Sequence, residues 1–121
     1  MRVLLTDKST LITQRLEELL SEIIFILGTD KASSYDEALA LFKQYRQDVV
    51  VADMNLADNT SCRLVKEIKE LAPHTTIIMM FIDADEYIME QCKKMGADFF
   101  FDKYHEFEKI PVVINEIAAN S

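Results

Sequence analysis

The chain has 121 residues, of which 50% are hydrophobic and 28% charged, and it contains only two glycines and two prolines. This composition is typical of one compact domain and excludes a disordered or collagen-like chain. The formal net charge of −8 argues against non-specific binding to nucleic acid, because Lys and Arg side chains must neutralise the phosphates. We therefore expect one domain over residues 1–121 that makes no direct nucleic acid contact.

Apolar runs alternate with amphipathic segments along the first half of the chain. The runs are continuous, as in strands that are buried on both faces, and the amphipathic segments have the spacing of helices. Ser or Thr stands where each helix would begin and can cap it. The elements predicted here are a strand at Val3–Leu5, a helix at Ser9–Glu22, a strand at Ile23–Leu27 closed by Gly28, a helix capped by Ser34, and a strand at Val49–Ala52.

The same alternation continues in the second half. Pro73 and Gly96 end two of the helices there. The predicted elements are a helix at Cys62–Leu71, a strand at Thr76–Ile82, a helix at Glu86–Met95, a strand at Phe99–Phe101 and a helix at Val112–Ala119. Five strands alternating with five helices predict an α/β fold, a parallel sheet with helices on both faces.

No segment is suited to cross or target a membrane. The longest apolar run, Ile77–Ile82, has six residues, and the N-terminal segment has three consecutive apolar residues. The first is too short to span a bilayer and the second too short for a secretory signal. We expect a cytoplasmic location and no membrane partner, and we interpret Cys62 and Cys92 as free, buried thiols.

Polar residues follow the predicted strands at the edge where parallel sheets bind their ligands. Two carboxylates that lie close together repel each other unless a cation separates them, and an oxygen-rich site suits Mg²⁺. A nearby Lys can neutralise a phosphoryl group that an Asp carboxylate accepts. The polar strand-end residues are Asp7, Lys8, Asp53, Asn55 and Lys103, and the apolar Phe81 and Ile82 stand at the end of the fourth strand. The chemistry indicates a site that handles phosphoryl groups, and the alternative is that these residues only cap helices and solvate loops.

Along essentially its whole length the chain resembles the receiver domains of bacterial response regulators. The resemblance rests on Asp7 and Asp53 after apolar strands, on Asn55, on the stretch DADEYIMEQCKKMGAD, and on FFFDK, which ends in Lys103. It implies a flavodoxin-like (βα)5 sheet in the order 2-1-3-4-5.

The resemblance also implies a role for several residues. Asp53 matches the phosphoacceptor and Lys103 the lysine that contacts the phosphoryl group. Asp7, Asp53 and the backbone carbonyl of Asn55 match the Mg²⁺ ligands, and Phe100 matches the aromatic residue that changes rotamer on activation. The implied partner is a sensor histidine kinase or phosphotransfer protein, with a possible homodimer through the last strand and its helices.

Three positions depart from the family pattern. Lys8 stands where the second acidic metal ligand is usual, so Mg²⁺ binding should be weakened, and we hypothesise that Lys8 pairs with Asp53 and partly replaces the cation. Phe81 replaces a Ser or Thr hydroxyl that bonds the phosphoryl group, and Ile82 replaces a small residue and narrows the entrance.

Three functions follow as alternatives. The first is a receiver, not an enzyme, that accepts a phosphoryl group on Asp53. The second is a degenerate receiver that binds proteins or dimerises without phosphorylation. The third is a flavodoxin-like electron carrier, which the missing loop glycine and the charge of Asp7 disfavour because both would hinder binding of an FMN phosphate.

Overall fold

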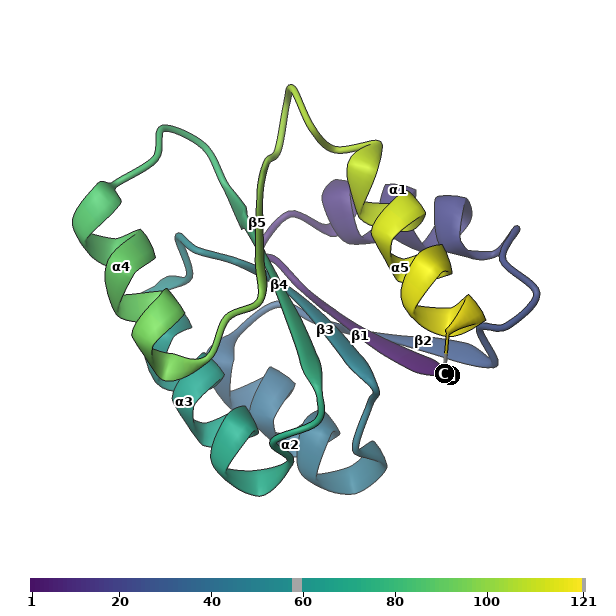
Figure 1. The fold of residues 1–121 in the computed structure, drawn as a ribbon, viewed down its shortest axis with the longest axis horizontal. Coiled ribbons are helices and arrows are strands. Elements are labelled where there is room, and N and C mark those ends of the chain that lie inside the picture. The colour runs from purple at the N-terminus through teal and green to yellow at the C-terminus, as the bar shows by residue number, and fades with distance from the viewer. Residues whose placement is uncertain (58–59, 121) are drawn as a thin grey trace.

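A computed structural model describes residues 1–57 and 60–120 and shows a five-stranded parallel sheet in the order β2-β1-β3-β4-β5 (Figure 1). This order and the parallel pairing confirm the fold predicted from the sequence. The strands are β1 (Arg2–Thr6), β2 (Gly28–Ala32), β3 (Val49–Asp53), β4 (Thr76–Phe81) and β5 (Phe99–Asp102). The helices are α1 (Thr10–Leu20), α2 (Tyr35–Tyr45), α3 (Ser61–Leu71), α4 (Glu86–Met95) and α5 (Lys109–Ala119).

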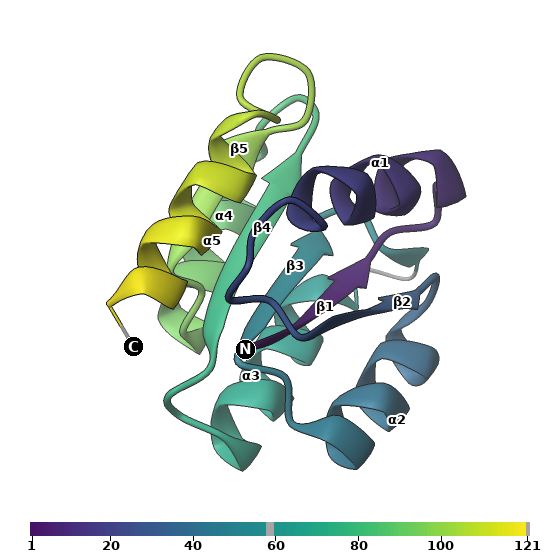
Figure 2. The same ribbon diagram turned by 90° about the vertical axis from the view of Figure 1, so that its right-hand side faces the viewer.

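Helices cover both faces of the sheet. Figure 2 looks onto the face covered by α1 and α5, and in Figure 1 helices α2, α3 and α4 lie on the opposite face. Each face has its own buried cluster of apolar side chains: Leu16 of α1 and Ile114 of α5 belong to one, and Phe42 of α2 and Ile68 of α3 to the other. Because both faces are covered, β3 is buried throughout and β1 and β4 are buried except at their ends, which explains their unbroken apolar runs.

The predicted second strand is wrong. Ile23–Leu27 does not form a strand; β2 begins at Gly28 and has the polar sequence GTDKA. It pairs only with β1 and forms an edge of the sheet, where charged side chains meet solvent and discourage further strand pairing. Only some of the apolar residues in the segment before β2 contact the core. Ile23 and Ile26 pack on it, while Ile24 and Leu27 are exposed.

The helix boundaries largely follow the predicted capping signals. The side chain of Ser34 accepts a hydrogen bond from the backbone N–H of Glu37 at 3.2 Å, and Ser9 caps α1 in the same way. Gly96 ends α4 with a φ of 116°, a left-handed conformation that residues with a side chain seldom adopt. Helix α5 begins three residues earlier than expected, with Pro111 in its first turn, where the missing N–H breaks no helical hydrogen bond.

The two cysteines were also predicted wrongly. Cys62 in α3 and Cys92 in α4 form a disulfide, with their Cα atoms 4.9 Å apart, and are not free thiols. The burial expected for Cys92 is confirmed, since its side chain has no exposed surface. A sequence separation of 30 does not reveal that these helices pack together. None of the helices in the part of the chain that the structure describes is long and apolar enough to cross a bilayer.

Beyond its backbone pairing with β1, the edge strand β2 is fastened to its neighbours by the charged side chain of Asp30. Asp30 accepts hydrogen bonds from the Arg2 guanidinium at 2.7 and 2.9 Å and from the Gln47 amide at 2.9 Å. The hydrogen bonds from Arg2 lower the pKa of the Asp30 carboxyl, although partial burial acts in the opposite direction. The charged form of Asp30 is therefore stabilised in the folded protein.

We expect Asp30→Asn to lower the free energy of unfolding by about 1–2 kcal/mol near neutral pH. Because folding lowers the pKa of Asp30, its contribution is present above the unfolded value of about 4 and is lost as the pH falls through the folded value. The difference from the wild type should therefore shrink at about pH 3. Urea unfolding followed by circular dichroism at both pH values measures this difference. An equal loss at both would contradict the charge-based explanation, and the exposed Asp83→Asn serves as the control.

Candidate functional site

Asp7, Asp53 and Lys103 meet at the carboxyl ends of β1, β3 and β5. The Lys103 ammonium Nζ lies 2.6 Å from Asp7 Oδ2 and 3.1 Å from Asp53 Oδ2, so a single cation bridges both carboxylates. All three side chains are at least nine-tenths buried. The structure therefore brings together three of the residues that the sequence predicted for the site.

Side-chain alternation explains why these residues share a side of the sheet. In β3, Val49 and Val51 point into the α1–α5 cluster, and Asp53 continues that row. Asp7 continues the corresponding row of β1, after Val3 and Leu5, and Lys103 follows Phe101 at the same spacing in β5. The alternation along each strand therefore directs all three charged side chains towards one point.

Backbone hydrogen bonds across the sheet fix the chain where these residues stand. The N–H of Lys103 donates to the carbonyl of Phe81 at 2.8 Å, and that of Asp7 donates to the carbonyl of Ala32 at 3.1 Å. The N–H of Met54, which follows Asp53, donates to the carbonyl of Met80 at 2.8 Å. The charged side chains thus project from a rigid edge and not from free loops.

The remaining carboxylate oxygens are held by local turns. Asp7 Oδ1 accepts a hydrogen bond from the N–H of Ser9, and Asp53 Oδ1 accepts one from the N–H of Asn55, both at 2.9 Å. Asp7 Oδ2 is buried, and beyond its contact with Lys103 it has no hydrogen bond among the described residues. That oxygen therefore keeps lone pairs for another positive group.

The ammonium of Lys103 is stabilised in spite of its burial. Burial acts to lower the pKa of Lys103, but its hydrogen bond to Asp7 and the negative charges of Asp53 and Asp7 outweigh this effect, so the pKa is raised. Lys103 is thus protonated in the physiological range, and its contribution to stability is lost only when the pH rises above the ordinary lysine value of about 10.4.

The hypothesised pairing of Lys8 with Asp53 is wrong. Lys8 is exposed and forms no ion pair among the described residues, whereas the partner of Asp53 is Lys103. Lys8 instead lines a shallow surface hollow together with Ser33, Asp36 and Arg63. The ammonium that pairs with Asp53 belongs to Lys103, which directly follows β5 and is buried. Burial excludes water and so strengthens the attraction between the ammonium and the carboxylate.

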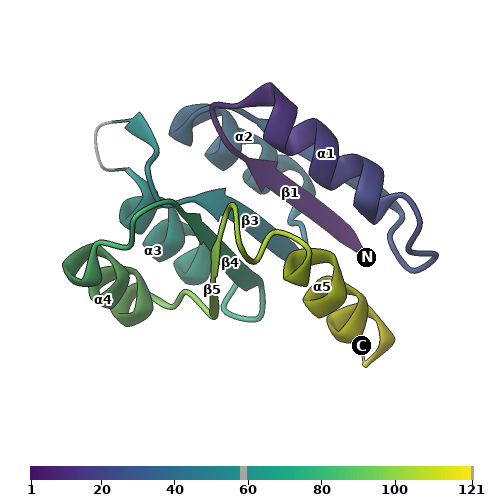
Figure 3. The ribbon, with the colours of Figure 1, turned by 90° about the horizontal axis from the view of Figure 1, so that it is seen from above.

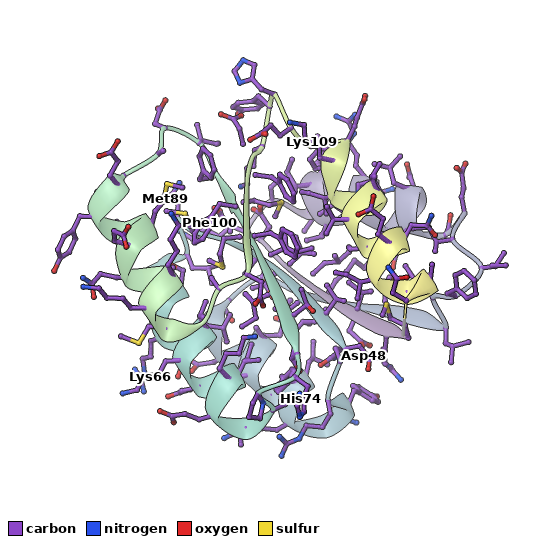
Figure 4. The ribbon with its side chains drawn as sticks, in the orientation of Figure 1. Asp48, Lys66, His74, Met89, Phe100 and Lys109 are labelled. Carbon is purple, nitrogen blue, oxygen red and sulfur yellow. A yellow bond between two sulfur atoms is a disulfide. The ribbon has the colours of Figure 1, made fainter. Side chains whose placement is uncertain are left out.

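Phe81 and Phe100 lie on the opposite side of the sheet. Both side chains are half-buried and pack on the cluster beneath α2, α3 and α4. Figure 4 shows Phe100 close to Met89 of α4, and the Lys93 ammonium lies 5.7 Å from the centre of the Phe100 ring. The site therefore has a charged side and an aromatic side, and Phe81 contributes no hydroxyl to either.

One contributor to the site was missed by the sequence reasoning. Ser61, which was not among the predicted site residues, donates a buried hydrogen bond from Oγ to the carbonyl of Met54 at 2.7 Å. This bond fastens the first turn of α3 to the residue after Asp53. A serine at a helix start was the available signal, but its partner depends on how the loop folds.

The residues at this site could bind a divalent cation that takes only a few of its ligands from the protein. No group of three or more His, Cys, Asp or Glu side chains that could hold a metal occurs within residues 1–57 and 60–120. Asp7 and Asp53 nevertheless supply two adjacent carboxylates, and Mg²⁺ commonly takes one or two carboxylates together with waters and a phosphoryl oxygen.

A (βα)5 sheet with an acidic pair and a lysine at its carboxyl edge defines a receiver of the two-component signalling type. The family model of the response regulator receiver domain matches residues 3–115, and the chain belongs to this family. The chemotaxis protein CheY of Halobacterium salinarum is 32% identical over 97% of this chain and 93% of its own length.

Solved structures agree with this assignment. A response regulator receiver domain protein from Clostridium thermocellum is 26% identical, with a TM-score of 0.85 over 98% of this chain and 94% of that one. A CheY-like receiver domain protein from Methanospirillum hungatei has a TM-score of 0.88 at 21% identity, over 98% of this chain and 94% of that one. The second likeness supports the fold alone.

We expect Lys103→Met to lower the free energy of unfolding by about 3–5 kcal/mol near neutral pH, because two buried carboxylates lose their shared counter-ion. Chemical denaturation of the variant and the wild type at neutral pH measures this deficit.

Lys109→Met is the matched control, because Lys109 pairs with Glu106 at the surface, near the start of α5 in Figure 4. Its loss should cost less than about 1 kcal/mol. Equal effects of the two substitutions would contradict a special role for the buried ion pairs.

Proposed function

We propose that this domain accepts a phosphoryl group on Asp53 from a sensor histidine kinase or a phosphotransfer protein. Receiver domains interact with such partners as a family. The observation that carries the assignment to Asp53 is its buried carboxylate, held by the N–H of Asn55 and paired with Lys103. No observation on the described residues favours the alternative of a phosphorylation-independent module.

In the proposed reaction a carboxylate oxygen of Asp53 attacks phosphorus, and the bond from phosphorus to the donor nitrogen breaks. The electron pair of that bond stays with the donor imidazole, which becomes neutral on leaving or takes up a proton. Lys103, 3.1 Å from Asp53 Oδ2, offsets the negative charge that arrives on the transferred oxygens. The domain acts here as the phosphoryl acceptor and not as an enzyme with a further substrate.

Receiver domains bind Mg²⁺ at the phosphorylation site, and the residues that would hold it here are Asp7, Asp53 and the backbone carbonyl of Asn55. The ion supplies positive charge that neutralises phosphoryl oxygens. We propose that Mg²⁺ binds more weakly to this protein than is usual for the family, because the positively charged Lys8 follows Asp7 directly in the sequence. We also propose that the missing hydroxyl at Phe81 weakens the conformational response to phosphorylation.

We also propose that the protein is cytoplasmic and that it forms a homodimer. The beryllofluoride-activated NtrC4 receiver domain, described as a dimer, is 26% identical to this chain, with a TM-score of 0.82. Tyr87, Phe99 and Tyr104 are exposed on α4, on β5 and just after β5, which supports a second copy at this face.

We expect the protein to gain one phosphoryl group when it is incubated with acetyl phosphate and Mg²⁺, as read by intact mass. Asp53→Asn should abolish this gain because the amide is not a nucleophile of comparable strength. The exposed Asp36→Asn should leave it unchanged. An unmodified wild-type mass with both acetyl phosphate and histidine kinase donors would refute the proposal.

We expect Lys8→Asp to raise the affinity for Mg²⁺ by about tenfold or more, because it exchanges a positive charge for a third carboxylate. Lys8→Met removes the charge without adding a ligand and should have a smaller effect. NMR titration with Mg²⁺ measures the two dissociation constants. If the Asp variant bound no more tightly than the Met variant, position 8 would lie outside the coordination shell.

A further inference from the structure

Helix α4 has little buried surface of its own. Of its ten residues only Cys92 is buried, while Ile88 and Met89 are half-buried and Tyr87 is 74% exposed. Burial of apolar side chains is what normally holds a helix to a domain. Ile88, Met89 and Met95 also pack on the core cluster, but the disulfide joins the one buried residue of α4, Cys92, covalently to Cys62 of α3.

The two ends of α4 are attached differently. At the C-terminal end, Lys69 of α3 forms an ion pair with Asp98 at 3.0 Å, and its side chain packs closely against Gly96. At the N-terminal end, the Asp85 carboxylate accepts hydrogen bonds from the backbone N–H groups of Tyr87 and Ile88, within α4 itself. Figures 1 and 3 show α3 and α4 side by side, so the disulfide supplies the covalent link between two neighbouring helices.

The chain segments that lead into both linked helices are hydrogen-bonded to neighbours of the site residues. Ser61, the residue before Cys62, donates its buried hydrogen bond to Met54, which follows Asp53 directly. Helix α4 follows the segment 82–85, which leaves the sheet at Phe81, and the carbonyl of Phe81 holds the N–H of Lys103. A change in the link between α3 and α4 therefore acts on two segments that border the acceptor site.

The two sulfur atoms differ in a way that suits exchange chemistry. Cys62 is the second residue of α3 and half-buried, whereas Cys92 has no exposed surface. A helix N-terminus stabilises negative charge, so it favours a thiolate at Cys62. Cys62 Sγ also lies 3.6 Å from the carbonyl oxygen of Ile88, a distance at which a reduced thiol can donate a hydrogen bond. The reduced state therefore has a partner ready on α4.

We propose that Cys62 and Cys92 form a redox-active pair whose state controls how firmly α4 is held beside the acceptor site. For reduction, the thiolate of a dithiol reductant attacks Cys62 Sγ, the S–S bond breaks, and Cys92 leaves as a thiolate and takes up a proton. The second thiolate of the reductant then attacks the reductant sulfur of the mixed disulfide, the bond to Cys62 Sγ breaks, Cys62 leaves as a thiolate, and the reductant is released as its own cyclic disulfide. A peroxide reverses the change: its O–O bond breaks, the two thiols lose two electrons and two protons, and water and the S–S bond form.

The test compares the full chain before and after treatment with dithiothreitol under native conditions. Alkylation read by intact mass should detect no thiols in the oxidised protein and both thiols after reduction, and hydrogen peroxide should restore the oxidised mass. Amide hydrogen exchange in α4 should rise by about tenfold or more on reduction, while exchange in β1 and β3 stays unchanged. Neither readout requires phosphorylation, so failure here is distinguishable from failure of the proposed function.

The double variant Cys62→Ser, Cys92→Ala is the control, and dithiothreitol should leave its exchange unchanged. The reduced wild type should also melt about 10 °C below the oxidised form, because the unfolded chain loses its cross-link. If native reduction fails to expose the thiols, or if reduction leaves exchange in α4 unchanged, the proposal is overturned. The wild-type comparison decides the matter even if the double variant does not fold.

Discussion

The contact of one lysine ammonium with two buried carboxylates is the interaction on which this domain depends. Lys103 contacts Asp7 and Asp53, which come from strands at the centre of the sheet, while the lysine comes from an edge strand. Two carboxylates buried this close would repel each other without it. The ion pairs therefore stabilise the carboxyl edge of the sheet and hold the acceptor carboxylate in place.

The sheet separates this charged site from the aromatic side chains of the family pattern. Asp7, Asp53 and Lys103 extend the rows that face α1 and α5, whereas Phe81 and Phe100 pack beneath α2, α3 and α4. The main chain of β4 and β5 therefore connects the acceptor with α4 across the sheet, in addition to the connection through α3 and the disulfide. The hydrogen bond between Lys103 and Phe81 is one such connection.

Sequence reasoning was most successful where residue type and local structure agree. The central strands, the caps at Ser9 and Ser34 and the stop at Gly96 depend on nearest neighbours, and the structure confirms them. The second strand was misplaced because its apolar neighbours in sequence, Ile23–Leu27, look more like a strand than the polar GTDKA does. An edge position favours polar residues, and which strand forms an edge is a property of the whole sheet.

The family follows from the match of the whole sequence to the receiver domain model. The alternation of strands and helices, and the strand ends that carry Asp7, Asp53 and Lys103, could be read from periodicity and residue type, which act over a few positions. The folded structure alone reveals that Lys103 and not Lys8 bridges the carboxylates, and that Cys62 meets Cys92. Both outcomes depend on distances between elements far apart in the chain, and on the burial that makes one ammonium a stronger partner than its exposed rival.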